Sequence, residues 1–83
     1  MPLPAAHLHS MIDRDGAAIL DVERGLISTL NPTGGYVWQR LERGEALESI
    51  ITDLARETGE DVVLVDRDVR DFIDDLKHRQ LLG

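Results

Sequence analysis

The chain has no cysteine among its 83 residues. Disulfides, thiolate metal sites and a cysteine nucleophile are therefore excluded, and the composition fits a reducing cytosol. Aromatic residues make up only 4% of the sequence, with one Trp, one Tyr and one Phe, so the core must consist mainly of Leu, Ile and Val. A chain of this length folds as one domain with a modest core. We expect a single domain over residues 1–83, with residues 1–6 flexible.

Long hydrophobic runs and excess basic charge are also missing. No apolar stretch approaches the roughly 18 residues of a membrane span, and the N-terminus lacks the pattern of a signal peptide. We therefore expect a cytoplasmic protein without a membrane partner. Lys and Arg number 9 against 16 Asp and Glu, which gives a formal net charge of −7. Phosphate binding needs a basic face, so nucleic acid is not an expected partner.

Hydrophobic periodicity predicts strands at residues 8–12, 17–22 and 26–30. In the second strand, Ala17 and Ile19 share one face with Asp21. The segments "DRDG" (13–16) and "ERG" (23–25) are turn signals, and Gly25 is expected in the left-handed conformation. The strand order along the chain predicts an antiparallel meander.

Three helices are predicted to follow the strands. Asn31 and Pro32 form a strong helix start, because Asn caps free N–H groups and Pro suits the first helical position. Gly34 and Gly35 lower helix propensity, so we expect another part of the chain to approach that turn closely. The second helix is predicted at about residues 46–58. The third is predicted from Asp66, as N-cap, to about residue 78, after a loop or brief extended segment at 60–65.

The predicted fold is α+β and resembles a winged helix-turn-helix domain, with a three-stranded antiparallel meander followed by three helices. Leu81 and Leu82 are expected to fold back onto the core. No internal repeat interrupts this plan.

We find no catalytic constellation. His7 and His9 form an H-x-H pair without an obvious third ligand, so solvent-exposed histidines are favoured over a metal site. The aspartates of the third helix alternate with basic residues, which is typical of an exposed helix face. No phosphate-binding glycine loop or nucleophile motif is present. We therefore predict a protein that is not an enzyme, with no metal site and no cofactor.

The third predicted strand, residues 26–30, has no charge and no proline. Edge strands are usually blunted by Lys, Pro or a bulge, and an unguarded edge invites a partner strand. A strand this short also needs little protection, so the pattern alone leaves the question open. Two alternatives remain: a winged-helix DNA-binding regulator, which the acidic third helix disfavours, and a structural subunit that docks on a larger enzyme through apolar helix faces.

An ordered set of motifs runs from Ala17 to Leu82. It comprises a hairpin ending in Leu30-Asn31, then "TG" and the pair Val37-Trp38, a Gly-bearing break, an aliphatic helix, and a closing Leu-Leu. The third helix adds the pattern Asp68, Val69, Phe72, Ile73 and Leu76. In these features the chain resembles the PqqD-like family, the recognition elements that bind leader peptides of ribosomally made precursors (RiPPs). Gln80 departs from the pattern, because the family usually has Gly before the final leucines.

The resemblance implies a function and a binding mode. The leader would dock antiparallel to the third strand, in a groove formed with the third helix. Carried onto this chain, the peptide-binding residues would be Leu26, Ile27, Ser28, Thr29, Leu30, Val69, Arg70, Phe72, Ile73, Leu76 and Lys77, with Leu30 and Phe72 assigned first to the core. Arg70 and Lys77 would meet acids of the leader.

The chain is most similar to the standalone leader-binding proteins of lasso-peptide pathways. Their partners are the precursor leader peptide and a separate cysteine leader peptidase, with other maturation enzymes in addition. The alternative within the family is the peptide chaperone of pyrroloquinoline quinone synthesis.

Overall fold

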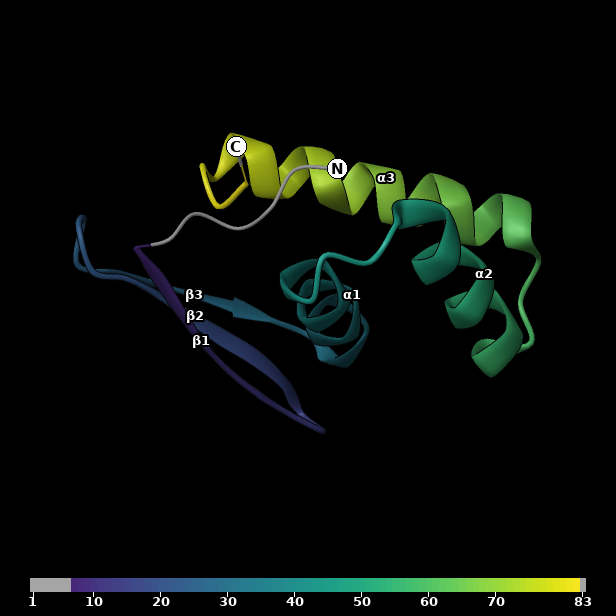
Figure 1. Cartoon of the computed structure of the whole chain (residues 1–83), viewed down its shortest axis with the longest axis horizontal. Helices are drawn as coiled ribbons and strands as arrows, with labels where there is room; N and C mark the ends of the chain where they lie inside the picture. The colour runs from purple at the N-terminus through teal and green to yellow at the C-terminus, as the bar shows by residue number, and fades with distance from the viewer. Residues whose placement is uncertain (1–6, 83) are drawn as a thin grey trace.

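The computed structural model describes residues 7–82, so the expected flexibility of residues 1–6 lies outside the described residues. Strands β1 (Leu8–Asp13), β2 (Gly16–Asp21) and β3 (Leu26–Leu30) form one antiparallel sheet in the order β1-β2-β3. Helices α1 (Pro32–Glu42), α2 (Leu47–Thr58) and α3 (Val62–His78) follow. The predicted α+β fold is confirmed. In Figure 1, α1 lies between the sheet and the pair formed by α2 and α3.

One face of the sheet packs on α1 and builds the core. Ile19, Trp38 and Leu41 are 0% exposed. The single Trp is also held at its polar end, because its Nε1–H donates to the Ser10 hydroxyl at 3.0 Å and that hydroxyl donates to Glu42 at 2.7 Å. A buried indole N–H needs such a partner. The buried residues of α1 are Gly34, Gly35, Val37, Trp38 and Leu41.

The glycines of α1 have close neighbours, as predicted. A Cβ on Gly35 would lie 3.0 Å from the backbone of Gly16, and a Cβ on Gly16 would lie 2.0 Å from the Leu30 carbonyl oxygen. Gly16 also has a φ of +133°, a conformation that other residues rarely adopt. The β1–β2 turn, the end of β3 and the start of α1 therefore meet backbone to backbone.

Two predicted boundaries are wrong. Helix α3 begins at Val62, five residues earlier than predicted, because the Asp61 side chain accepts from the Val63 N–H at 2.8 Å and caps the helix. Asp66, the predicted cap, lies inside the helix and accepts from Arg70 at 2.8 Å. The β2–β3 turn spans residues 22–25, one more than the predicted "ERG".

The β2–β3 turn is held by a buried carboxylate. Asp21 is 4% exposed, and its Oδ1 accepts from the backbone N–H groups of Glu23 and Arg24, each at 3.0 Å. His7 Nε2 lies 3.6 Å from the other oxygen. Gly25 has a φ of +67°, as the turn signal predicted. This turn fixes where β3 begins.

The C-terminal segment closes the core. Leu81 and Leu82 are 3% and 5% exposed, which confirms that they fold back. Gln80 adopts a φ of 62°, the left-handed conformation that a Gly would adopt more easily. The departure at this position therefore leaves the last turn intact. Within residues 7–82, no helix has the length and apolar character that crossing a bilayer requires.

Candidate functional site

Strand β3 lies at an edge of the sheet, with β2 as its only neighbour among the three described strands. In an antiparallel ladder, every second residue directs its N–H and C=O toward the neighbouring strand and the others point away. The outer edge of β3 therefore presents backbone donors and acceptors beyond those that β2 uses. Ile27 on this strand is 70% exposed. Residues 26–30 contain no Lys, Pro or bulge, the features that usually protect an edge strand from pairing.

A groove of about 510 Å³ lies between the end of β3, the start of α1, the C-terminal half of α2 and the length of α3. Its apolar floor consists of Leu30, Val37, Leu54, Val65, Val69 and Phe72. Polar side chains form the rim, namely Thr29, Asn31, Thr33, Thr58, Glu60, Asp68, Asp75 and Arg79. An apolar floor with a few polar groups around it is the usual form of a ligand site. Here it adjoins an open strand edge.

Phe72 forms the part of the floor nearest α1. Its ring is half-buried, and a Cβ on Gly34 would lie 3.2 Å from two ring carbons. The missing side chain at Gly34 thus lets the ring lie against the first turn of α1. That turn is fixed by Asn31, whose Oδ1 accepts from the Gly34 N–H at 2.7 Å. The glycine, the cap and the ring together shape the floor.

The groove-facing rim of α3 carries charge. Asp75 and Arg79 form an ion pair with a distance of 3.0 Å, four residues apart on the helix. Asp68 lies one heptad before Asp75, so the two carboxylates share a side of α3. Arg67 Nη2 is 3.4 Å from Asp68 Oδ1, but both side chains are about two-thirds exposed (66% and 64%), and such pairs are weak.

Some of the predicted site residues are brought together in this groove. Thr29 and Leu30 line it from β3, and Val69 and Phe72 line it from α3. Leu30 is buried, as assigned, whereas Phe72 is only half-buried and belongs to the floor as much as to the core.

The other β3 residues lie on its two faces outside the groove lining. Leu26 and Ser28 alternate with the exposed Ile27, which pairs with Leu20 on the face away from α1. Ile73 and Leu76 are 6% and 0% exposed and belong to the core.

Arg70 and Lys77 lie on a different side of α3. At about 100° per residue, they point away from the side that carries Asp68, Phe72 and Asp75. Arg70 is held by Asp66 at 2.8 Å, and this hydrogen bond, together with the charge of Asp66 and of Glu48 in α2, raises the pKa of Arg70.

Sequence reasoning did not select several groove residues: Asn31, Thr33, Gly34, Asp68, Asp75 and Arg79. A signal for three of them was present. Asp68, Phe72, Asp75 and Arg79 follow one another at spacings of four, three and four, which places them on one helix side. The sequence pattern predicts one solvent-exposed face for the acids of α3. The structure instead places Asp68 and Asp75 along the groove and Asp74 outside its lining.

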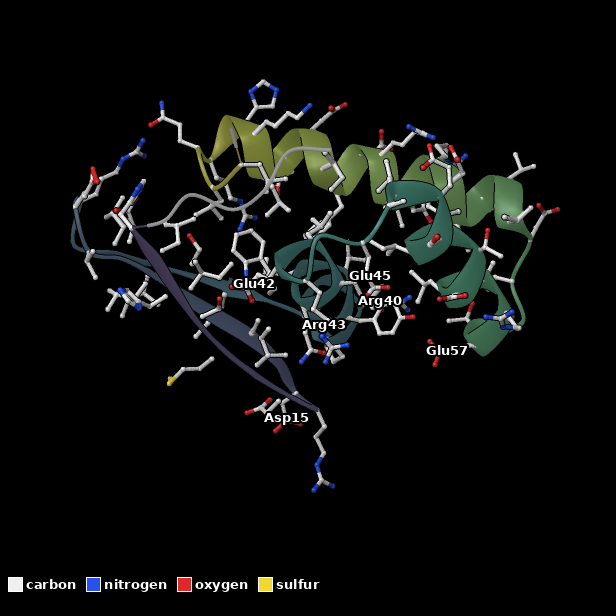
Figure 2. All side chains as sticks on the ribbon, in the orientation of Figure 1. Asp15, Arg40, Glu42, Arg43, Glu45 and Glu57 are labelled. Carbon is white, nitrogen blue, oxygen red and sulfur yellow. The ribbon has the colours of Figure 1, made fainter. Side chains whose placement is uncertain are left out.

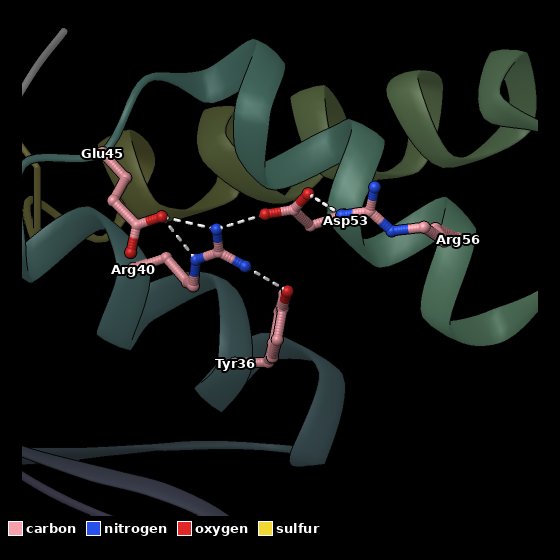
Figure 3. A network of polar contacts seen from close by, with 5 residues as sticks. All are labelled: Tyr36, Arg40, Glu45, Asp53 and Arg56. Carbon is pink, nitrogen blue, oxygen red and sulfur yellow. Dashed lines mark hydrogen bonds and ion pairs between the residues drawn. The ribbon is translucent and has the colours of Figure 1, made fainter.

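A network of polar side chains joins α1 to α2 (Figure 3). Arg40 on α1 donates to Glu45 and to Asp53 of α2, with Nη2–O distances of 2.5 Å to each, and also to the Tyr36 hydroxyl. Arg56 pairs with the second oxygen of Asp53. Figure 2 shows Arg40 and Glu45 next to each other where α1 faces α2.

This network shifts the pKa of its members. The hydrogen bond from Arg40 lowers the pKa of Asp53 below its ordinary value of 3.8. Hydrogen bonds to Glu45 and Asp53 raise the pKa of Arg40. Burial is the main cause that raises the pKa of Tyr36, and the hydrogen bond with Glu57 raises it further. Arg40 of α1 and Asp53 of α2 are at its centre, so the network joins these two helices.

Neither histidine near the N-terminus joins a metal cluster. Within residues 7–82 no group of three or more His, Cys, Asp or Glu side chains could hold a metal ion. His9 is exposed, as expected. His7 is only partly exposed, contrary to the prediction, because its ring lies beside Asp21 and Glu23 near the β2–β3 turn.

Comparisons with known proteins bear on this geometry. The structure superposes on that of TbiB1 in complex with the TbiA(beta) leader peptide, with a TM-score of 0.90 and 28% sequence identity, over 98% of this chain and 94% of that one. It also matches a lasso peptide synthetase B1 complexed with its leader peptide, with a TM-score of 0.87 and 21% identity, over 96% and 94% of the two chains.

The search of curated protein sequences gave no match. The model of one protein family, described as coenzyme PQQ synthesis protein D (PqqD), matches residues 16–82. This match spans the sheet from β2 onward, all three helices and the C-terminal leucines. The chain therefore belongs to the PqqD family.

Proposed function

We propose that this protein binds the leader segment of a ribosomally synthesised precursor peptide by strand addition to β3 and presents it to a separate maturation enzyme in lasso-peptide biosynthesis. The observation that carries the proposal is the open edge of β3 beside the apolar groove. The resemblance to TbiB1, which is 28% identical and was solved with a leader peptide, supports the same site and the same class of ligand.

The binding mode follows from the two parts of the site. The leader, extended and antiparallel to β3, exchanges backbone hydrogen bonds with residues 26–30. These bonds supply affinity without reading sequence, and side-chain pockets supply selectivity. Leader side chains on the inner face enter the groove and contact Leu30, Val69 and Phe72. Those on the outer face lie beside Ile27.

We assign presentation rather than catalysis to this chain. Among the residues that the structure describes, the groove rim holds no histidine, serine or cysteine that could act as nucleophile or base with a neighbour. A separate cysteine leader peptidase would supply the nucleophile, since none of the 83 residues is cysteine. Such a pathway operates in the cytoplasm, where the precursor is made.

The test is a titration of the leader encoded beside this gene, followed by a scan in which each leader amide is N-methylated in turn. Strand addition predicts losses of affinity at every second residue, because only alternate N–H groups point toward β3. N-methylation changes the ligand alone, so the fold of the protein is not at issue. Losses without a period of two, or none, would contradict strand addition.

The family name raises one alternative, the peptide chaperone of pyrroloquinoline quinone synthesis. Both functions use a leader and the same edge, so the site does not separate them. Titration against a lasso-precursor leader and a quinone-precursor peptide does, and we expect the lasso leader to bind more tightly. If the protein shifted duplex DNA in a gel, the result would instead favour a winged-helix DNA-binding regulator.

A further inference from the structure

The rim of the groove has an unequal charge. Three carboxylates, Glu60, Asp68 and Asp75, line it together with one basic side chain, Arg79. Arg79 is already paired with Asp75 at 3.0 Å. Among residues 7–82, the one ion-pair partner of Asp68 is the exposed Arg67, at 3.4 Å. The groove thus offers an incoming peptide a negative edge, in a chain whose formal net charge is −7.

Acidic residues on a helix are ordinarily a solvated face, and their number alone indicates no ligand. Asp68 differs from its neighbours in position. It lines the same groove as the apolar floor and as Thr29 and Leu30 at the end of β3, whereas Asp74 is exposed on α3 and does not line the groove. An extended chain added to β3 would pass over the floor and alongside Asp68.

Helix and strand spacings match along this rim. Asp68 precedes Phe72 by four residues, which is about 6 Å of helix rise. In an extended peptide, side chains on the same face repeat every two residues, or about 6.8 Å. One peptide side chain can therefore lie on Phe72 while its same-face neighbour reaches Asp68.

Building on the proposed leader binding, we propose that the groove selects an extended segment with a Lys or Arg two residues from an apolar side chain. The apolar side chain packs on Phe72 and the basic group pairs with Asp68. An acidic residue at the same place is disfavoured by like-charge repulsion. Asp68 is thus a specificity-determining residue of the leader site.

The experiment selects binders from a displayed library of random linear peptides, with the full chain as bait. The expected consensus has Lys or Arg at a fixed two-residue spacing from an apolar position. Replacing that basic residue by Gln should weaken binding about fivefold, or about 1 kcal/mol. With the variant Asp68→Asn, the same replacement should change the affinity little.

The matched control is Asp74→Asn, which removes the same charge from the same helix away from the groove. It should retain the fivefold preference for the basic peptide. A consensus without basic residues, or equal preferences in the two variants, would overturn this inference and leave leader binding in place. A library that yields no binder would count against the proposed function itself, and with it this inference.

Discussion

Two regions of this domain differ in how far their hydrogen-bonding groups are paired: the β3–α3 side, which holds the groove, and the α1–α2 corner, which holds the Arg40 network. In the corner, Arg40 joins Glu45, Asp53 and Tyr36, and its side chain is only 16% exposed. On the other side, β3 leaves backbone groups unused by β2, and a groove with an apolar floor adjoins it. Hydrogen-bonding capacity is satisfied in one region and available in the other.

The difference indicates how a chain of 83 residues separates stability from recognition. In the corner, the contacts of Arg40 with Asp53 hold α1 against α2. Stability can therefore come from this corner, and the polar groups of the groove are left for a ligand. The two regions meet at Gly16 and Gly35, where the sheet and α1 touch through backbone atoms. Changes in the three places should therefore have different consequences.

The largest effect is expected from Gly16→Ala, which damages both regions at once. Its Cβ would lie 2.0 Å from the Leu30 carbonyl oxygen, with φ at +133°. We expect a loss of more than about 3 kcal/mol in the free energy of unfolding, measured by urea denaturation. Gly25→Ala is the matched control, because it shares a positive φ of +67° but has no atom within 4 Å of its Cβ. Its loss should be about 1–2 kcal/mol.

Phe72→Ala should separate binding from folding. The ring forms the groove floor and is only half-buried, so its loss should weaken leader affinity roughly tenfold, about 1.4 kcal/mol. Isothermal titration calorimetry measures this effect. Ile73→Val, a change in the core with no groove contact, should lower stability and leave affinity unchanged. Equal affinity losses in both variants would mean that the floor has no direct role.

Arg40→Ala should lower stability without weakening leader binding, the reverse of Phe72→Ala. It leaves Glu45 and Asp53 without their shared partner, so we expect a fall in Tm of about 5 °C and an unchanged leader affinity at a temperature where the variant is folded. Arg56→Ala is the comparison, since its side chain is 72% exposed and pairs with Asp53 alone. It should shift Tm much less. A large loss of affinity in Arg40→Ala would show that the two regions are coupled.

The smallest effect concerns acid. The pKa of Asp53 is lowered from its ordinary 3.8, chiefly by the hydrogen bond from Arg40. Because the folded-state pKa lies below the unfolded one, this contribution is fully present above about pH 4 and is lost as pH falls through the folded-state pKa. The measurement is the difference in Tm between the wild type and Asp53→Asn along a pH series. That difference should shrink on acidification, and a constant difference would contradict the pairing.

The groove could be predicted only in part. The edge position of β3 and the Asn31 cap followed from strand order and capping rules, whereas the involvement of Val69 and Phe72 was implied by the family resemblance. Arg70 and Lys77 were also implied by the resemblance and were expected to meet acids of the leader, and the structure places them away from the groove lining. Residues 60–65 were predicted as loop because Asp66 fits an N-cap, yet Asp61 fits equally well and is the one used.

The sequence by itself determined the elements of this protein: hydrophobic spacing, Gly and Asn at turns, and Pro at the start of α1 define local structure without distant contacts. Tertiary structure alone decided which side of α3 faces β3. That choice depends on packing of Phe72 against Gly34 and on the backbone contact between Gly35 and Gly16. These contacts join residues far apart in the chain, and no local pattern specifies them. The same packing divides the acids of α3 between the groove and the solvent.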